Sequence, residues 1–468
     1  MSVPFRARDA VRWTHGHLAQ GDPEALLAGV SIDSRTLVPG QLFAAIVGER
    51  LDGHAYLEAA IRGGAAGVLV ARGRALPAER KPDLPVIAVE DTTRALGALA
   101  AGHRAGFEGP VVAVTGSNGK TTTKEMCAAI LAVAAPCLKN AGNLNNQWGL
   151  PLTLLAREPE HRSAVVELGM NHRGEIAALA AIARPDVGVI TNVGAAHIEH
   201  LGSREEIALE KGDLVAGLDA GATAVLNADD PRVLAQARRT RARVMRFGLG
   251  AGAEVRAEGL RRVASRASAF ELIAPAGRAA VEVAGIGETT VRNALAAAAA
   301  ALAAGAPLDH LAPGLAGYRP VAGRLEQRPL PGGGLLIDDS YNANPQSMEV
   351  ALRLLVELAR EAGGRALAAL GDMGELGAAA PEAHARTGAL AAELGVDFLC
   401  ALGDHAGRVA EAAVAAGLAR ERVAVARDHA DAARRLAAGL DPRDRVLVKG
   451  SRAMHMERVV HALCGEGR

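Results

Sequence analysis

Aromatic residues are scarce in this chain and make up 2% of its 468 residues. The hydrophobic cores must therefore be built from Ala, Val and Leu, and no aromatic platform for stacking nucleic-acid bases stands out. The formal net charge is zero, which gives no overall electrostatic attraction to nucleic acid or to an anionic membrane. We expect neither of these to be the main partner.

Cysteines and long apolar runs are scarce as well. The four cysteines (Cys127, Cys137, Cys400 and Cys464) are scattered without a Cys-x2-Cys pair, so neither a zinc site nor a disulfide framework is indicated. The longest run of small apolar residues, 294–304, is too short to span a bilayer. The N-terminus lacks the apolar region of a signal peptide. We expect a cytoplasmic protein without membrane insertion.

The most informative segment that is present is 111–123, VVAVTGSNGKTTT. A β-branched run ends in a glycine-rich turn, and a lysine, hydroxyl residues and a helical pattern follow, which is typical of a strand, a phosphate-binding loop and a helix. Lys120 is expected to reach the β- and γ-phosphates of a nucleotide, and the Thr121 hydroxyl to bind Mg²⁺. Val114 stands where the first glycine of the usual spacing belongs, so this is a short form of the motif.

Strand and helix patterns alternate along the whole chain. A chain of 468 residues is too long for one core, so two to four domains are expected. Before residue 90, strands at 30–32, 42–47 and 67–71 with a helix at 55–62 predict a small α/β unit. A linking helix is expected at 90–106.

Two larger α/β units follow. In the first, the strand candidates 164–168, 187–192 and 222–226 suggest a parallel sheet, and 255–283 suggests an antiparallel insertion before a helix at 292–304. Residues 314–320 resemble a linker by their Gly and Pro content.

The third unit lacks the Gly-x-Gly-x-x-Gly signature of dinucleotide binding. Its expected strands and helices are 335–338, 346–359, 366–370, 398–402, 445–448 and 453–463. We therefore predict an α/β protein of three domains, 1–89, 90–316 and 317–468: a small α/β unit, a central phosphate-loop domain with a doubly wound, mainly parallel sheet, and a Rossmann-like unit.

Polar residues near the ends of the central strands are candidate site residues. Glu167 ends one strand and His197 follows another, and ligands bind at this edge of open α/β sheets. Mg²⁺ prefers oxygen ligands, so Glu167 suits it better than His197 does. Taken alone, Glu167 is as compatible with a structural role as with a functional one, and His197 is more typical of a satisfied core or loop histidine. The spacing around Lys211 alone is typical of a solvated helix face.

A second polar cluster, Asp338 to Pro345, lies where a strand of the third unit meets a helix. Asn344 before Pro345 suits a helix start, but the cluster is richer in polar groups than capping requires. Arg324, just after the linker, could be carried onto a nucleotide by domain closure.

Several further motifs accompany these along the chain, and we take the whole set together in its order of occurrence. The set is TGSNGKT (115–121), NLNNQWGLP (143–151), ELGMNHRGEI (167–176), TNVGAAH (191–197), KGD (211–213), RN (292–293), GR (323–324), DSYNANP (339–345), LGDMGELG (370–377) and KGSR (449–452). Together they resemble the Mur ligases of peptidoglycan synthesis, over essentially the whole chain.

The resemblance implies a UDP-sugar domain (1–89), an ATP domain (90–316) and a domain for the incoming amine (317–468). It implies four catalytic residues: Lys120, His197, Lys211 and Arg324. It implies that ATP is bound by Gly116, Ser117, Asn118, Gly119, Lys120, Thr121, Thr122, Asn293, Arg324 and Asp339. Two Mg²⁺ ions are implied at Thr121, Glu167, His197 and Lys211, with Lys211 carrying CO₂ as a carbamate. The implied substrate-binding residues are Ser34, Arg35, Thr36, Asn145, Asn146, Asn342 and Asn344.

Within the family, the resemblance is strongest to members that join D-alanyl-D-alanine to UDP-N-acetylmuramoyl-tripeptide, and it implies these small-molecule partners and a monomer. Two other amide ligases stay open, one adding a diamino acid and one of the folylpolyglutamate type. The segment DDPR (229–232) is similar to the DNPR signature of the diamino-acid ligases, but it lies in the central unit and looks like a helix start. A nucleotide switch is a third alternative, although the chain lacks an Asn-Lys-x-Asp guanine motif.

Overall fold

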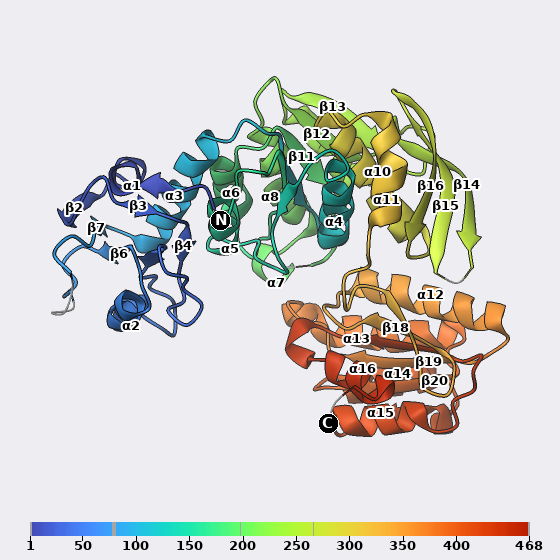
Figure 1. The fold of residues 1–468 in the computed structure, drawn as a ribbon. Coiled ribbons are helices and arrows are strands. Elements are labelled where there is room, and N and C mark those ends of the chain that lie inside the picture. Colours follow the sequence, from blue (N-terminus) through green and yellow to red (C-terminus); the bar gives the residue numbers. More distant parts are fainter. Residues whose placement is uncertain (1, 77–80, 197, 265, 467–468) are drawn as a thin grey trace.

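The structure is a computed structural model that describes residues 2–76, 81–196, 198–264 and 266–466. The chain forms three α/β units that follow one another in sequence, and the N-terminal unit lies to one side of the other two (Figure 1). The predicted fold class is confirmed. Among the described residues, no helix has the length and apolar character needed to cross a membrane.

The N-terminal unit is built on a mixed sheet in the order β2-β7-β6-β5-β4, with β2 antiparallel to β7 and the other pairs parallel. Its strands are β1 (Phe5–Arg6), β2 (His17–Gln20), β3 (Leu26–Leu27), β4 (Val30–Ser31), β5 (Leu42–Ala44), β6 (Gly67–Ala71) and β7 (Val86–Val89). Its helices are α1 (Ala7–Thr14) and α2 (Leu57–Arg62), and the linking helix α3 (Thr92–Ala105) follows. The Asp91 carboxylate caps α3 by accepting from the Arg94 N–H.

The central unit has a parallel sheet in the order β13-β12-β11-β8-β10-β9. Its strands are β8 (Val111–Thr115), β9 (Cys137–Lys139), β10 (Ser163–Glu167), β11 (Val187–Ile190), β12 (Thr223–Asn227) and β13 (Arg243–Phe247). The chain proceeds from β8 to one edge and then returns to the other side of β8. This reversal places the carboxyl end of β8 at the topological switch point, where open α/β sheets bind ligands.

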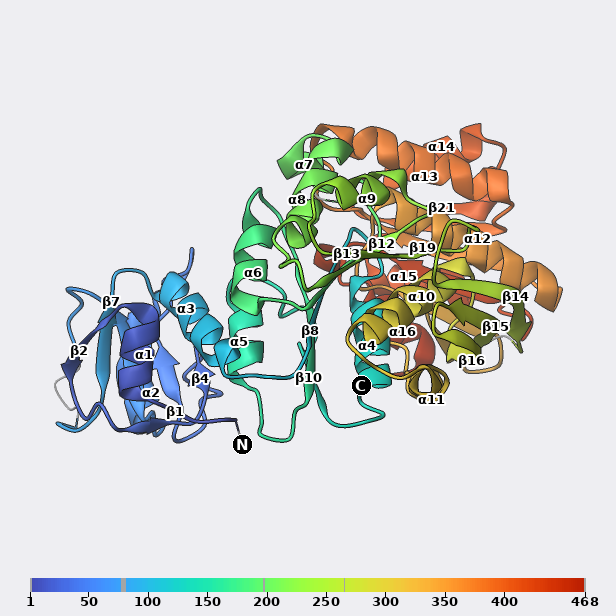
Figure 2. The same cartoon turned by 90° about the horizontal axis from the view of Figure 1, so that it is seen from above.

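Helices cover both faces of this sheet, as Figure 2 shows from above. On one face lie α3, α5 (Gly149–Leu155), α6 (Glu175–Ala183) and α8 (Arg204–Ala216), and on the other lie α4 (Lys120–Leu131), α10 (Glu288–Ala303) and α11 (Leu311–Gly317). The short helices α7 (Ile198–Leu201) and α9 (Pro231–Leu234) lie in loops. Asp230 caps α9, so the DDPR segment is a helix start, as expected.

The predicted antiparallel insertion is confirmed as the sheet β14-β15-β16. Its strands are β14 (Arg256–Val263), β15 (Ala267–Ala274) and β16 (Gly277–Ala284). The predicted linker at 314–320 is wrong in its first half, because residues up to Gly317 belong to α11. A Cβ at Gly314 would lie 2.4 Å from the Cα of Ile130, so this glycine serves the close packing of α11 on α4 and not chain flexibility.

The C-terminal unit has a sheet in the order β17-β18-β22-β19-β20-β21, parallel except for the edge strand β17. Its strands are β17 (Glu326–Pro329), β18 (Leu335–Asp339), β19 (Ala366–Gly371), β20 (Phe398–Leu402), β21 (Val423–Val425) and β22 (Arg445–Lys449). Its helices are α12 (Pro345–Ala362), α13 (Ala380–Leu394), α14 (Ala406–Ala415), α15 (His429–Ala437) and α16 (Glu457–Cys464).

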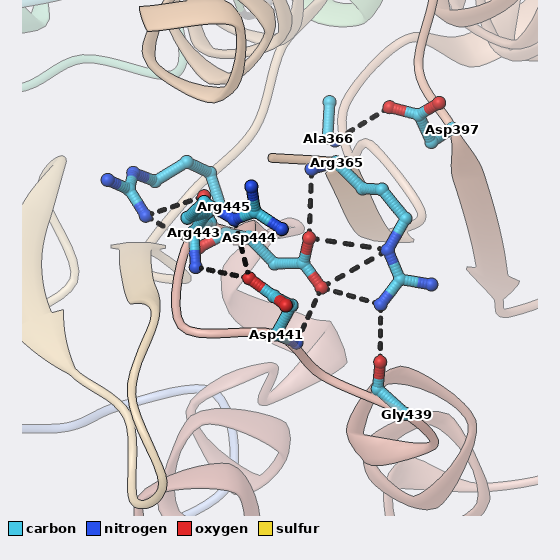
Figure 3. Close-up of polar contacts among 8 residues, drawn as sticks. All are labelled: Arg365, Ala366, Asp397, Gly439, Asp441, Arg443, Asp444 and Arg445. Carbon is cyan, nitrogen blue, oxygen red and sulfur yellow. Dashed lines mark hydrogen bonds and ion pairs between the residues drawn. The ribbon is translucent and has the colours of Figure 1, made fainter. Parts of the chain in front are cut away.

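A buried carboxylate joins the amino ends of β19 and β22, at the edge of the C-terminal sheet opposite its polar loops (Figure 3). Asp444 is 1% exposed and accepts from the Arg365 backbone N–H (2.8 Å), the Arg365 guanidinium (2.5 Å) and the Asp441 N–H (2.9 Å). Burial alone raises the pKa of Asp444, but these hydrogen bonds outweigh it and lower the pKa. This cluster is structural and leaves the carboxyl edge free for a site.

Candidate active site

The loop between β8 and α4 is built around two glycines that admit no side chain. A Cβ at Gly116 would lie 1.8 Å from the Thr191 Oγ1 atom. Gly119 has φ +81°, and a Cβ there would lie 2.3 Å from the Asn293 Oδ1 atom. Gly119 is also the N-cap of α4 and supplies no capping side chain, so the first-turn N–H groups stay open toward an anion.

Asn192, at the end of β11, fixes the shape of this loop. Its carbonyl accepts from the Ser117 N–H (3.0 Å), its side-chain oxygen accepts from the Asn118 N–H (2.9 Å), and its amide donates to the Asn118 carbonyl (2.9 Å). The Lys120 Nζ atom donates to the Gly116 carbonyl at 2.9 Å. Burial lowers the pKa of Lys120; the Glu167 carboxylate opposes this shift and the Arg324 guanidinium adds to it.

Glu167, at the end of β10, lies directly beside the loop. The Thr121 hydroxyl donates to its Oε2 atom at 2.7 Å and the Asn145 amide donates to its Oε1 atom at 2.8 Å. Glu167 is 3% exposed. A hydroxyl and a carboxylate at this position are the hard oxygen donors that Mg²⁺ prefers, so the residues fit the ion that the sequence predicted.

Lys211 is buried, with 1% of its surface exposed. The prediction that it lies on a solvated helix face is therefore wrong. Burial, supported by the charge of Lys120, lowers its pKa well below the usual value, while Glu210 and Glu167 oppose the shift. Its amine is therefore held toward the neutral form, the form that can react with CO₂. His197, predicted to lie near this group, is outside the described residues.

Residues of the C-terminal unit lie opposite the phosphate loop and form the second wall of the site. The Arg324 guanidinium donates to the Thr121 hydroxyl at 3.3 Å and lies 4.2 Å from the centre of the Tyr341 ring. Asp339 accepts from the Leu325 N–H (3.1 Å) and from the Lys449 Nζ atom (2.5 Å). These contacts bring the end of the linker and the ends of β18 and β22 onto the phosphate loop.

Asn344 connects the two units directly. Its side-chain oxygen accepts from the Ser347 N–H at 3.0 Å and thereby caps α12, as the sequence predicted. Its amide donates to the Asn118 Oδ1 atom at 2.8 Å. Asn342 contributes its carbonyl to Lys449 at 2.9 Å. Both asparagines are therefore part of the wall that faces the phosphate loop.

A cavity of about 1030 Å³ opens between these walls. This volume suits a nucleotide or a larger ligand. Its lining includes residues from all three units, among them Glu49, Asn146, Thr122, Asn293 and Arg452. In contrast, the predicted residues Ser34, Arg35 and Thr36 lie on an N-terminal loop apart from the described lining, where Arg35 pairs with Asp33 at 2.7 Å.

Sequence reasoning missed Asn140, which supports Glu167. Its side chain accepts from the Glu167 N–H at 2.8 Å and donates to the Glu167 carbonyl at 3.2 Å. The fully buried Lys124 donates to the Asn140 carbonyl at 2.6 Å. A single asparagine after a short strand carries no pattern that could have indicated this role.

Two polar residues of the C-terminal unit, His384 and Asp372, bond to backbone groups of its loops. His384 is buried, accepts from the Met373 N–H at 2.9 Å and has its other ring nitrogen 2.6 Å from the Ala380 carbonyl. Asp372 accepts from the N–H groups of Asp404 (2.7 Å) and His405 (3.2 Å). Both residues hold loops of the C-terminal unit in place.

A phosphate loop at the switch point of a parallel sheet, closed by a Rossmann-like unit that reaches the loop with an arginine, defines a nucleotide-dependent enzyme of several domains. Three family models match in succession: "Mur ligase family, catalytic domain" over 27–104, "Mur ligase middle domain" over 114–301 and "Mur ligase, glutamate ligase domain" over 323–452. The chain belongs to the Mur ligase family.

Individual relatives extend over nearly the full chain. The UDP-N-acetylmuramoyl-tripeptide–D-alanyl-D-alanine ligase of Escherichia coli is 39% identical over 444 residues, 94% of each chain. A crystal structure of MurF from Acinetobacter baumannii is similar with a TM-score of 0.89 at 33% identity, covering 99% of both chains. MurF ligase from Thermotoga maritima in complex with ADP has a TM-score of 0.81 at 29% identity, covering 94% of this chain and 97% of that one.

Proposed function

We propose that this chain joins D-alanyl-D-alanine to UDP-N-acetylmuramoyl-tripeptide and converts ATP to ADP and phosphate, as a monomer in cytoplasmic peptidoglycan precursor synthesis. The observation that carries the proposal is the contact of the Thr121 hydroxyl with both the Glu167 carboxylate (2.7 Å) and the Arg324 guanidinium (3.3 Å). It joins the phosphate loop, an oxygen ligand and the third domain at one point. The name of the 39% identical relative supports the choice of substrates.

In the reaction, the terminal carboxylate of the tripeptide attacks the γ-phosphorus of ATP, and ADP leaves. The amine of D-alanyl-D-alanine then attacks the carbonyl of the acyl phosphate, loses a proton and expels phosphate. A carboxylate is a poor nucleophile toward a polyanion, so neutralising charge is the main task. Lys120, Arg324 and the open N–H groups of α4 supply positive charge. Asn293 and Asp339, which line the cavity, would contact the nucleotide.

Thr121, Glu167, His197 and a carbamate on Lys211 would hold Mg²⁺. The ion would supply positive charge that neutralises the phosphate oxygens and makes the γ-phosphorus more electrophilic. The carbamate forms when the neutral Lys211 amine bonds to the carbon of CO₂ and releases a proton. This change replaces a cation that repels Mg²⁺ with an anion that attracts it, and the lowered pKa of Lys211 supports it.

The three units divide the substrates between them. Residues 1–89 hold the UDP-sugar, with Ser34, Arg35 and Thr36 on the uridine side, and residues 90–316 hold ATP. Residues 317–468 hold the dipeptide. Asn145 and Asn146 lie near the tripeptide, and Asn342 and Asn344 lie where the amine enters. Closure of the third unit keeps water from the acyl phosphate.

The experiment is phosphate release from ATP in the presence of UDP-N-acetylmuramoyl-tripeptide, with D-alanyl-D-alanine, a free diamino acid or glutamate as the amine. We expect release to depend on the tripeptide and to accelerate with D-alanyl-D-alanine alone. Acceleration by the diamino acid or by glutamate would assign the chain to one of the other amide ligases. Hydrolysis that needs no amine would favour a nucleotide switch.

A further inference from the structure

Helix α12 contacts the central unit at both ends. Its N-cap, Asn344, donates to Asn118 of the phosphate loop at 2.8 Å. Near its other end, Glu357 and Glu361 both pair with Arg262 on β14 of the antiparallel insertion, Glu357 at 2.5 Å. A helix of 18 residues is about 27 Å long. One rigid rod therefore spans from the phosphate loop to the insertion.

The middle of α12 touches the central unit as well. Ile286, between β16 and α10, belongs to the same hydrophobic cluster as Leu352, Leu354 and Leu355 of α12. Figure 1 shows α12 lying along the end of the insertion sheet, so the contacts follow the length of the helix. The insertion and the turn that follows it thus form a docking surface for α12, made of Arg262 and Ile286.

The ion pairs at Arg262 differ from the other ion pairs of the insertion. The Arg262 side chain is 22% exposed, whereas that of Arg278, which pairs with Glu271 and Glu258 within the insertion, is 59% exposed. Glu357 and Glu361 are one helical turn apart, and like charges at this spacing repel each other. One arginine between them removes this repulsion only when the third unit is docked.

Resting on the proposed function, we infer that the ion pairs of Arg262 with Glu357 and Glu361 form a lock between the two domains. This lock holds α12 in a fixed position against the phosphate loop and so favours the closed enzyme. Arg262 is a positioning residue, because it acts through α12 on the residues proposed to bind the amine, Asn342 and Asn344, and touches no substrate. The apparent affinity for a ligand that needs the closed state falls in proportion to the closed fraction. The lock therefore affects the KM for the dipeptide more than the binding of nucleotide to the central unit.

The test is the full-length Arg262→Glu variant, assayed by phosphate release and by small-angle X-ray scattering with ADP. We expect the KM for D-alanyl-D-alanine to rise about tenfold, a factor that corresponds to 1.4 kcal/mol. The radius of gyration increases and the Kd for ADP rises less than the KM does, while the melting temperature stays unchanged. The variant with Glu357→Arg and Glu361→Arg added restores the KM to within about threefold of wild type and restores the radius of gyration.

Arg278→Glu is the matched control, because it makes the same charge change on the same sheet without touching α12, and we expect wild-type behaviour. A wild-type KM and radius of gyration in Arg262→Glu would overturn the inference, as would failure of the charge swap in a protein with normal melting temperature. The scattering arm needs no amine substrate, so it tests the lock even if D-alanyl-D-alanine fails to accelerate phosphate release in the wild type.

Discussion

Replacing Lys120 with methionine separates the role of this lysine in catalysis from its role in the fold. Methionine keeps most of the length of the side chain and removes its charge. The fold loses one hydrogen bond, from the Nζ atom to the Gly116 carbonyl at 2.9 Å, worth about 1 kcal/mol. Relief from the burial that lowers the pKa of Lys120 offsets part of this loss.

The loss in catalysis is larger. A unit charge about 4 Å from a phosphate oxygen contributes about 4 kcal/mol at an effective dielectric constant near 20. Each 1.4 kcal/mol is tenfold in rate, so we expect kcat/KM to fall by about 10³. The melting temperature should change by no more than about 3 °C.

The assay is coupled ADP formation with both substrates, alongside thermal unfolding. Lys139→Met is the control, since Lys139 is exposed and pairs with Glu125; both its rate and its stability should stay near wild type. Lys124→Met is the converse case, because this buried lysine bonds the Asn140 carbonyl at 2.6 Å: its stability should fall more than its rate. Turnover by Lys120→Met within tenfold of wild type would show that the charge of Lys120 is not needed at the phosphates.

Three other predictions concern single side chains. Lys211→Ala should be inactive and partly recover with small carboxylic acids, and activity unaffected by the substitution would remove the carbamate from the mechanism. Glu167→Gln, which keeps the shape that accepts from Thr121, should shift the Mg²⁺ dependence of the rate to about tenfold higher concentrations; an unchanged titration would contradict the ligand assignment. Asp444→Asn should lower the free energy of unfolding by about 2 kcal/mol at pH 7, as the loss of hydrogen bonds to a charged group does, measured by urea denaturation. Because the folded-state pKa of Asp444 is depressed, its contribution to the free energy of unfolding is present above the unfolded-state pKa near 4 and is lost as the pH falls through the folded-state pKa. The difference in the free energy of unfolding between wild type and variant should therefore shrink in acid. A difference that stays constant with pH would count against the charge of Asp444 as the cause.

Local signals made most of the fold predictable. The β-branched run before Gly116, the Asn344-Pro345 helix start and the alternation after residue 255 each act within a few residues, and the structure contains the elements they predict. The linker prediction at 314–320 failed because Gly314 packs closely against Ile130 of α4, which is far away in sequence. A local glycine signal cannot reveal which distant backbone packs against it.

The site was predictable to the same extent. Glycine spacing and strand ends singled out Lys120, Thr121 and Glu167 as candidates, and these residues lie close together in the structure. The burial of Lys211 could not be predicted from the sequence, because acidic neighbours on the same helix give no sign that this lysine faces inward. The contact between Asn344 and Asn118 joins positions that lie 226 residues apart, so only the assembled domains show it.

The proposed reaction requires the loop from Gly116 to Thr121 to hold a triphosphate so that the end of the peptide becomes phosphorylated. The fate of ¹⁸O placed in the terminal carboxylate of UDP-N-acetylmuramoyl-tripeptide tests this step. Mass spectrometry should find one ¹⁸O atom in the released phosphate, because the attacking oxygen leaves with phosphorus when the amine captures the carbonyl. Amide formation that yields unlabelled phosphate, or label in AMP, would exclude an acyl phosphate formed from ATP.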